Sequence, residues 1–529
     1  MTTKPTRKVT LTPSLADLLF TTVFLLLFFT NTSRLLGDGD TGYHIRAGEY
    51  ILRTRSVPTF DLFSYHTPPI PWTAHEWLSE VLMAAIHSRF GLTGVDAFFA
   101  ALLALTIALL FRLQRSYRAD ILLTILITIS ALAAFKVHWL ARPHVFSFLF
   151  MVVYHDLLEY WRREQGTRLA LLPPLMLLWV NLHGGYLGGF LLLGAYLVGT
   201  LVKTWWAKGA ERRVQWGKVG QLVFTTAVSL AACLLNPQGY RILLFPFRLV
   251  GDTYIMDHIS EFMSVDFHQF APFKYLLLLL IALFAMGRRR MEVTELVLVL
   301  LFTNMALYSA RYIALFALVT APIMTRQAGE LGELREGRMA AFFRKRSENI
   351  MGIDARARGH LWPMMALCLV VAATCSGMVR HGFDEKTKAV RAAEFLLKEK
   401  ISGNMFDNDE IGDYLIYRTY PTYKVFFDGR SDMYGSTFMK EYYQVIKFQP
   451  GWEKILDKYR VTWIIFDTDS DFARFLLKSK EWPLIYSDNV ASIFVKDVLQ
   501  NQELIRKYRL VRPASYRTET EPAPTQREL

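Results

Sequence analysis

Apolar runs that are long enough, or nearly long enough, to cross a bilayer recur along this chain and alternate with short polar segments. A spanning helix needs about 20 apolar residues, and roughly 17 suffice when flanking residues take part. The pattern therefore predicts about eleven transmembrane helices. The runs lie at residues 12–30, 92–113, 120–137, 144–160, 168–182, 185–202, 219–235, 272–287, 292–308, 311–325 and 361–379.

Composition agrees with a membrane protein, because 52% of the 529 residues are hydrophobic and the mean hydropathy is +0.22. A net charge of +13 on a soluble chain would suggest a nucleic-acid partner. Here the basic residues form clusters between apolar runs, so topology accounts for them and no nucleic acid is expected. The cysteines, Cys233, Cys368 and Cys375, lie inside apolar runs without metal-ligand spacing, so no disulfide framework is expected.

The positive-inside rule orients these helices. The amphipathic segment 77–90 could lie flat in the interface or form a short extra crossing. If it is interfacial and the N-terminus, with Lys4, Arg7 and Lys8, is cytoplasmic, the inner loops carry far more basic residues than the outer ones. The inner loops are those near 112–118, 162–168, 203–218, 288–290 and 326–360. The first run has no small-residue cleavage site after it, so it should remain as a helix. We expect a multi-pass protein of the bacterial cytoplasmic (inner) membrane with its C-terminal part outside.

The first outer loop, residues 31–91, is long and polar. Loops of this kind tend to carry function when a rigid scaffold holds them. Asp38 and Asp40 follow the first helix in a Gly-flanked turn, and Asp40 and His44 share one face if a helix begins there. A carboxylate near the membrane surface can deprotonate an acceptor or hold a divalent cation. The alternative for Asp40 is a helix N-cap.

Further polar groups fall in the other outer turns. His75 and Glu76 precede segment 77–90, and Arg142 with His144 flanks a proline. A planar Arg fork suits phosphate oxygens. The alternatives are helix capping for Glu76 and headgroup contact for Arg142. Other outer-turn candidates are Asn181, His183 and Arg311, where a C-cap with interhelical hydrogen bonds is the alternative for the first two.

Beyond residue 380 the spanning pattern stops. Strands are predicted at 424–428, 461–467 and 491–496, and helices near 386–400, 437–446, 451–459 and 470–478. This alternation predicts a small extracytoplasmic α/β domain over 381–511, following a transmembrane domain over 1–380. In FFDGRSDMY, at 426–434, an internal ion pair is favoured over contact with an acceptor. Residues 512–529 are polar and Pro-containing, which predicts a disordered tail.

The segments DTGYHIRAGEYILRTRSVP and WTAHEWLSEVLMAAIHSRFG, together with the topology, resemble the GT-C superfamily of membrane glycosyltransferases. That superfamily includes the catalytic subunit of oligosaccharyltransferase, protein O-mannosyltransferases and lipid A aminoarabinose transferase. The resemblance implies a cytoplasmic N-terminus, a first outer loop with an essential Asp, and interfacial helices in that loop. Thr41 stands where many members have Glu. The C-terminal part has no WWDYG-type motif, so transfer to Asn sequons is not implied.

What the resemblance implies is a glycosyltransferase that moves a sugar from a polyprenyl-phosphate-linked donor to a protein, lipid or glycan acceptor, with inversion. The catalytic candidates are Asp40, Asp38 and Glu76, which are also the candidate ligands for Mg²⁺ or Mn²⁺. The candidates for binding substrate and phosphate are Arg142, His144, His183, Asn181, Arg311, His75 and His44.

Two other classes of protein are consistent with the apolar pattern. A transporter or flippase of a lipid-linked saccharide would show internal repeats and helices broken at mid-membrane, and the sequence shows no repeat. A non-catalytic membrane assembly protein would leave the loop carboxylates and the outer Arg and His side chains unexplained. No Walker A motif occurs, which argues against a nucleotide-driven pump.

Overall fold

The computed structural model describes residues 11–30, 34–166, 168–287, 290–329, 338–357 and 359–508. The predicted disordered tail 512–529, the N-terminal cluster of Lys4, Arg7 and Lys8, and Arg288 and Arg289 lie outside these ranges. The chain forms two compact units. We name the first the helical unit (Met1–Leu35, His75–Ser79 and Ile86–His381) and the second the mixed unit (Leu36–Ala74, Glu80–Ala85 and Gly382–Leu529).

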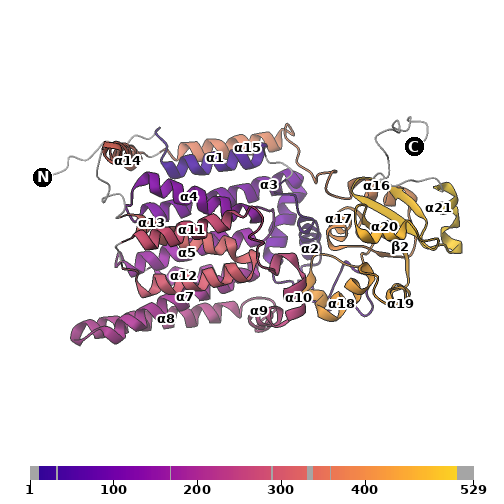
Figure 1. The fold of residues 1–529 in the computed structure, drawn as a ribbon, viewed down its shortest axis with the longest axis horizontal. Helices are drawn as coiled ribbons and strands as arrows, with labels where there is room; N and C mark the ends of the chain where they lie inside the picture. Colours follow the sequence, from indigo (N-terminus) through magenta and orange to yellow (C-terminus); the bar gives the residue numbers. More distant parts are fainter. Residues whose placement is uncertain are drawn as a thin grey trace. The chain divides into compact units, whose positions relative to one another are not determined.

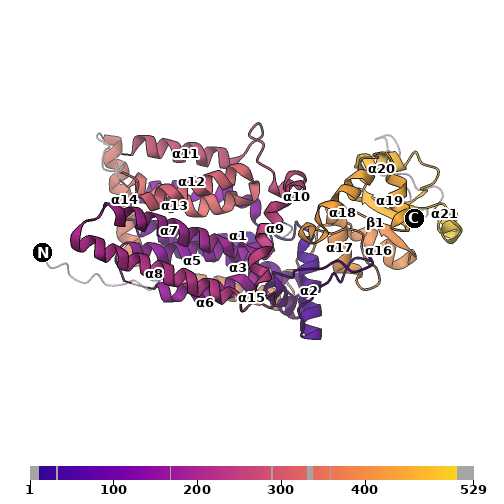
Figure 2. The same ribbon diagram turned by 90° about the horizontal axis from the view of Figure 1, so that it is seen from below.

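The helical unit is built from helices that run alongside one another, with α7 beside α8 and α12 beside α13 (Figures 1 and 2). Its main helices are α1 (Leu15–Thr30), α3 (Trp77–Arg115), α4 (Ile121–Phe135), α5 (His144–Arg162), α6 (Leu172–Leu182), α7 (Leu187–Trp206), α8 (Gly209–Cys233), α9 (Arg241–Gly251), α10 (Thr253–His258), α11 (Pro272–Met286), α12 (Val293–Tyr308), α13 (Ile313–Ala328), α14 (Arg338–Arg356) and α15 (Leu361–Cys375). Short 3₁₀ turns include η1 (Lys136–His138), η3 (Gly184–Tyr186), η4 (Ser260–Phe262) and η5 (Ala310–Tyr312).

Every apolar run identified in the sequence coincides with a helix. Three helical segments of the described chain are long and apolar enough to cross a membrane, namely Trp77–Arg115, Ile121–His138 and Gly184–Trp206. Shorter apolar helices cover Leu15–Thr30, Leu169–Leu182, Pro272–Met286, Val293–Tyr308 and Leu361–Cys375. A largely helical chain is therefore confirmed, and the count of eleven spans stays a prediction.

Helix α3 contains a break that divides its amphipathic first part from its apolar second part. Gly91 has φ 60° and ψ −161°, outside the helical region. Glycine adopts this backbone conformation without the steric cost that a Cβ would bring. Residues 77–90, predicted to be a separate amphipathic helix, are therefore distinct in direction from the apolar run that begins at residue 92.

Reporter fusions test the predicted topology. Fusions after residues 115, 165 and 210 should report a cytoplasmic position, and a fusion after residue 385 should report an outside position, because basic loops stay inside. Each site is fused in turn to a reporter that is active only in the cytoplasm and to one that is active only in the periplasm, and the two activities give its position. A cytoplasmic signal at residue 385 would reverse the placement of every polar turn.

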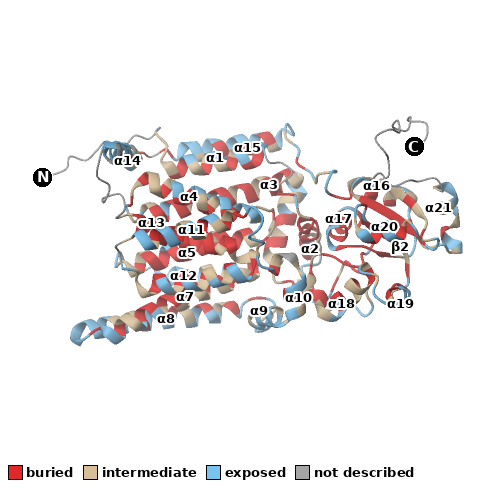
Figure 3. Ribbon diagram, in the orientation of Figure 1, coloured by how far each residue is buried: buried red, intermediate tan, exposed pale blue. Residues whose placement is uncertain are grey.

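The mixed unit combines helices with a four-stranded sheet of strand order β1-β2-β4-β3. Strand β1 pairs parallel with β2, and the other pairings are antiparallel. Both β2 and β4 are largely buried (Figure 3), which explains their nearly continuous apolar sequences. The elements are α2 (Asp40–Thr54), α16 (Val390–Glu399), β1 (Asn404–Phe406), α17 (Asp409–Thr419), α18 (Ser431–Ile446), α19 (Trp452–Lys458), β2 (Val461–Asp467), α20 (Asp471–Leu476), β3 (Leu484–Ser487), β4 (Ala491–Val495) and α21 (Gln502–Lys507).

The strand predicted at 424–428 is wrong. The backbone N–H groups of Phe426 and Phe427 donate to Oδ1 of Asp407, at 2.9 and 3.0 Å, instead of to a neighbouring strand. Val425 makes only an isolated bridge with Ser64. Because a side-chain carboxylate satisfies these donors, the segment is buried and apolar without belonging to the sheet.

The first outer loop belongs to the same compact unit as the C-terminal segment, whereas the sequence assigned it to the transmembrane domain. Helix α2 packs against α17. The Arg46 guanidinium donates from Nε to the carbonyl oxygen of Tyr417, at 2.8 Å, and from Nη1 to Glu49, at 2.7 Å. These contacts fix the loop helix on the C-terminal end of α17, where carbonyl groups lack helical partners.

Candidate functional site

Seven of the predicted site residues belong to the helical unit, and hydrogen bonds, ring contacts or electrostatic interactions link them. They come from the start of α3, the start of α5, the end of α6 and the turns around η4 and η5. The set is His75, Glu76, Arg142, His144, Asn181, His183 and Arg311. We call this set, with Glu261, the polar cluster. Sequence reasoning located it because each member sits in a turn on the predicted outer side.

His183 is the central member of the polar cluster. Its Nδ1 accepts from the backbone N–H of Gly185 at 2.9 Å and lies 2.7 Å from Oγ of Ser147. Trp179 Nε1 donates to that same Oγ at 2.7 Å, so the Ser147 hydroxyl proton is directed to His183. With Nδ1 accepting twice, the ring proton must lie on Nε2, which is 3.3 Å from Oε1 of Glu76. Geometry thus sets the tautomer that faces Glu76.

Burial and neighbouring positive charge keep His183 neutral. Burial lowers its pKa well below the ordinary value, and the charge of Arg311 lowers it further. His75 also lies by Glu76, with 3.7 Å between its Nε2 and Oε1. The carboxylate of Glu76 therefore has two imidazoles around it and can orient a hydroxyl or hold a proton between them.

Arg142 and Arg311 supply the positive charge of the polar cluster. Nη1 of Arg142 donates to Oε1 of Glu261 at 2.9 Å. The charge of Arg142 lowers the pKa of Glu261 to about 2, so Glu261 is ionised at neutral pH. The guanidinium of Arg311 stacks on the ring of Phe262, 5.1 Å from its centroid. The carboxylates of Glu261 and Glu76 balance these two permanent cations, and each guanidinium still has several N–H donors with which to hold an anion.

Asn181 and His144 hold the backbone of the polar cluster in place. Oδ1 of Asn181 accepts from Nε1 of Trp77 at 2.8 Å and from Nδ2 of Asn236 at 3.1 Å. Nε2 of His144 lies 2.9 Å from the carbonyl oxygen of His138. Asn181 thus makes the interhelical bonds that the sequence analysis weighed as its alternative.

The remaining predicted residues, Asp38, Asp40 and His44, belong to the mixed unit. Asp40 is the first residue of α2, and its N–H donates to Oδ1 of Asp38 at 2.9 Å. Gly39, and not Asp40, is therefore the N-cap residue of α2, and Asp38 accepts the N–H of the first helical residue. Nδ1 of His44 lies 3.4 Å from Oε1 of Glu80, and both side chains are 1% exposed. His44 thus holds α2 against the first turn of α3.

Asp40 lies against a second carboxyl group, that of Asp413 on α17. Asp413 is hydrogen-bonded to Asp40, and burial, followed by the negative charges of Asp40 and Asp428, raises its pKa well above the ordinary value. The Gly429 N–H donates to Asp413 at 3.1 Å. A Cβ at Gly429 would overlap Oδ1 of Asp40. The raised pKa favours a protonated Asp413 that is hydrogen-bonded to Asp40, beside a backbone that only glycine allows to approach.

A buried ion cluster lies next to this pair. Nη2 of Arg430 donates to Asp61 and to Asp428, each at 2.6 Å, and Tyr434 donates to Asp428 at 2.8 Å. Arg430 also stacks 4.6 Å from the ring centroid of Trp72. The internal ion pair predicted in the 426–434 segment is thereby confirmed, and it extends to the first outer loop through Asp61.

The three predicted metal ligands are not assembled within either unit. Asp38 and Asp40 belong to the mixed unit and are hydrogen-bonded as described, whereas Glu76 belongs to the helical unit. Over the ranges the structure describes, no three His, Cys, Asp or Glu side chains are placed to hold a metal ion. The Mg²⁺ or Mn²⁺ site therefore stays a prediction.

Sequence reasoning missed Ser147 and Asp413. Ser147 follows His144 by three residues on α5, so helical spacing could have placed it on the same face. Asp413 carried no such signal, because its partner Asp40 is far away in the sequence. Glu261 is not among the predicted site residues, and its ion pair with Arg142 places it in the polar cluster.

Comparisons with known proteins identify the fold. Neither a scan of protein-family models nor a search of curated protein sequences gives a match. The apo oligosaccharyltransferase of Archaeoglobus fulgidus matches with a TM-score of 0.52 and 11% identity, over 92% of this chain and 74% of that one. The oligosaccharyltransferase AglB of Archaeoglobus fulgidus, in complex with an inhibitory peptide and a dolichol-phosphate, matches with a TM-score of 0.53 and 12% identity, over 91% and 74%.

A further solved structure, ArnT from Cupriavidus metallidurans bound to undecaprenyl phosphate, has a TM-score of 0.45 and 11% identity, over 91% of this chain and 98% of that one. At 11–12% identity, the two oligosaccharyltransferase matches establish the fold alone. The chain has the fold of the GT-C enzymes, as its resemblance in the first outer loop predicts.

Proposed function

We propose that this protein is a GT-C-type glycosyltransferase that moves a sugar from a polyprenyl-phosphate-linked donor to an acceptor at the outer face of the membrane, with inversion. The observation that carries the proposal is the polar cluster, in which two arginines and several histidines meet at helix ends within a GT-C fold. The binding of dolichol-phosphate by the oligosaccharyltransferase of similar fold supports a lipid-linked donor.

Arg142 and Arg311 bind the leaving phosphate. In the transfer step, a bond forms between the acceptor and the anomeric carbon while the bond from that carbon to the phosphate oxygen breaks. The phosphate leaves with the electron pair, so negative charge grows on its oxygens. A guanidinium has five donors and can hold such an oxygen while it keeps a carboxylate partner, as Arg142 does with Glu261.

Asp40 takes the proton from the acceptor hydroxyl or amine. The raised pKa of Asp413 favours its protonated form, which supports Asp40 as the proton acceptor of the pair. Glu76, set between His75 and His183, orients a sugar or acceptor hydroxyl. General-base assistance of this kind contributes roughly 10²–10⁴-fold to rate.

Binding of a polyprenyl phosphate to the purified protein tests the proposed role of the arginines. Replacing both Arg142 and Arg311 by Gln should weaken binding about tenfold or more, because each charge-assisted contact to phosphate is lost. Arg241→Gln is the matched control, since Arg241 is an exposed arginine at the start of α9. Native mass spectrometry or microscale thermophoresis gives the affinities. Equal affinity of wild type and the double variant would contradict the proposal.

A further inference from the structure

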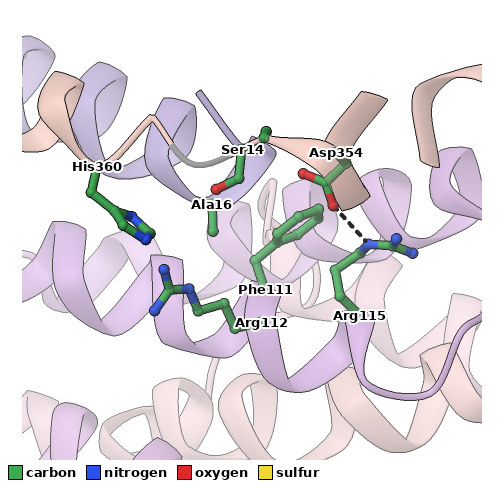
Figure 4. Close-up of a pocket in the computed structure, with 8 residues that line it drawn as sticks. Ser14, Ala16, Phe111, Arg112, Arg115, Asp354 and His360 are labelled. Carbon is green, nitrogen blue, oxygen red and sulfur yellow. Dashed lines mark ion pairs between the residues drawn. The ribbon is translucent and has the colours of Figure 1, made fainter. Parts of the chain in front are cut away.

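A cavity at the opposite, basic ends of the helices is not part of the polar cluster. It has a volume of about 330 Å³ and lies where α1 and α15 begin and where α3 ends (Figure 4). Arg112, Arg115 and His360 line it, together with Asp354. Its volume falls within the roughly 300–1,000 Å³ typical of small-molecule sites.

The arginines that line this cavity have N–H groups that could donate hydrogen bonds to a ligand. Within the described residues, Nε and Nη1 of Arg115 are buried without a hydrogen-bond partner, and Nε lies 3.5 Å from Oδ2 of Asp354. Nη2 of Arg112 lies 4.0 Å from Oδ1 of Asp17, and its side chain is 53% exposed. Buried donors of a charged group are stable only with an acceptor, so an anion would complete this site.

The carboxylates beside these arginines are engaged elsewhere. Oδ1 of Asp354 accepts from the N–H of Leu15 at 2.8 Å, and Oδ2 of Asp17 accepts from the hydroxyl of Ser14 at 2.6 Å. Both therefore satisfy the first turn of α1. Each also forms ion pairs at the cavity, Asp354 with Arg115 (Figure 4) and Asp17 with Arg112 and with Nδ1 of His360 at 3.1 Å, so an anion would bind to the guanidinium donors that these pairs leave over.

The cavity lies at the level where apolar helices end. Helix α1 is apolar from Leu15 onward, α15 is apolar from Leu361 onward, and the apolar part of α3 closes at Arg112. That level corresponds to the headgroup region of a bilayer, and the positive-inside rule makes it the cytoplasmic side. Helix α15 also exposes a run of apolar side chains, Met364, Met365, Leu369 and Val371.

We propose that this cavity binds the phosphate group of an anionic phospholipid of the inner leaflet. Arg115 and Arg112 contact the phosphate oxygens, His360 lies at the rim, and the acyl chains follow the exposed apolar side chains of α15. Basic pockets between membrane helices recognise anionic headgroups in this way. The apolar surface next to the cavity favours a lipid over free inorganic phosphate, which offers the same oxygens but no chains.

Native mass spectrometry of the full-length protein with phosphatidylglycerol, phosphatidylcholine or inorganic phosphate tests this proposal. Wild type should retain phosphatidylglycerol in preference to phosphatidylcholine. Replacing Arg112 and Arg115 by Gln should lower that retention about tenfold or more. Arg112→Gln alone should lower it severalfold, and this half-exposed side chain can be removed without opening the core. Arg212→Gln, on an exposed arginine near the start of α8, should change nothing.

Three results would overturn the proposal. The first is equal retention of phosphatidylglycerol by wild type and the Arg112/Arg115 double variant. The second is equal retention of phosphatidylcholine and phosphatidylglycerol by wild type. The third is binding of inorganic phosphate that displaces phosphatidylglycerol at equal concentration, which would assign the cavity to a free anion.

Discussion

Asp40→Asn should lower the rate of sugar transfer by about 10²–10⁴-fold, the usual contribution of a general base. Asn is nearly isosteric with Asp, and its amide can donate to Asp413 in place of the shared proton. Packing of α2 against α17 should therefore persist. Transfer from a lipid-linked donor in purified protein measures the rate, and the thermal unfolding temperature reports the packing.

Asp413→Asn is the matched control for this prediction. It also removes one carboxyl from the pair, but its amide donates to Asp40 and leaves that carboxylate ionised. Transfer should then stay within a few fold of wild type. If the two variants lose activity equally, Asp40 only holds the loop on α17. Asp38→Asn should have little effect, because the amide oxygen of Asn can accept the N–H of Asp40 as the carboxylate does.

Arg430→Met should destabilise the mixed unit by about 3–5 kcal/mol, because it leaves two buried carboxylates without their cation. Asp61 and Asp428 both depend on this guanidinium. Proteolysis of the full-length protein over a urea series measures the loss. Arg391→Met is the control, since Arg391 is 68% exposed in its ion pair with Glu385 and such pairs contribute about 0–1 kcal/mol. If the two variants lose the same free energy of unfolding, the burial of the Arg430 ion pairs does not make them more important to stability than an exposed pair.

The same ion cluster predicts how stability depends on pH. Burial opposes ionisation of Asp61, but the charge of Arg430 and the hydrogen bonds from Ser64, Phe63 and Arg430 together outweigh burial and lower the pKa from 3.8 to about 2. Asp61 therefore stabilises the folded unit above pH 4 by about 2 kcal/mol, and this contribution is lost as pH falls toward 2. In Arg430→Met, only the hydrogen bonds from Ser64 and Phe63 still oppose burial, so the deficit relative to wild type should shrink on acidification.

Hydrophobic patterning predicted the helices of the apolar runs and two of the four strands, but it gave no sign of α17. Val461–Asp467 and Ala491–Val495 read as strands because both are buried apolar runs of β-forming residues. The three residues of β1 are too few to give a pattern. Segment 424–428 had the same apolar character, yet Asp407 takes its backbone donors. The carboxylate of Asp407, about 20 residues earlier in the sequence, thus keeps this segment out of the sheet, and the local apolar pattern could not predict that contact.

The candidate site could be predicted where topology alone brings residues together. His75, Arg142, His183 and Arg311 all lie in outer turns, so one assignment of helix direction collected them. The neighbours of Asp40 were beyond such reasoning, because Asp413 and Gly429 approach it through the packing of α2 on α17. The pattern of charged residues predicts which turns lie at the same membrane surface. Contacts between segments that are distant in the sequence and lie outside the membrane can be seen only in the three-dimensional structure.

The mixed unit joins Leu36–Ala74 to Gly382–Leu529. Because these segments are far apart in the sequence, the first is synthesised well before the second. The loop emerges from the ribosome long before its partners, with the whole set of later membrane helices still to be made. At synthesis rates of about 5–20 residues per second, roughly 15–60 s pass before α17 is available. Throughout that interval Asp61 and the apolar face of α2 lack their native partners. The loop can therefore complete its packing only after residues 382 onward have been made, so assembly of this unit comes late in synthesis.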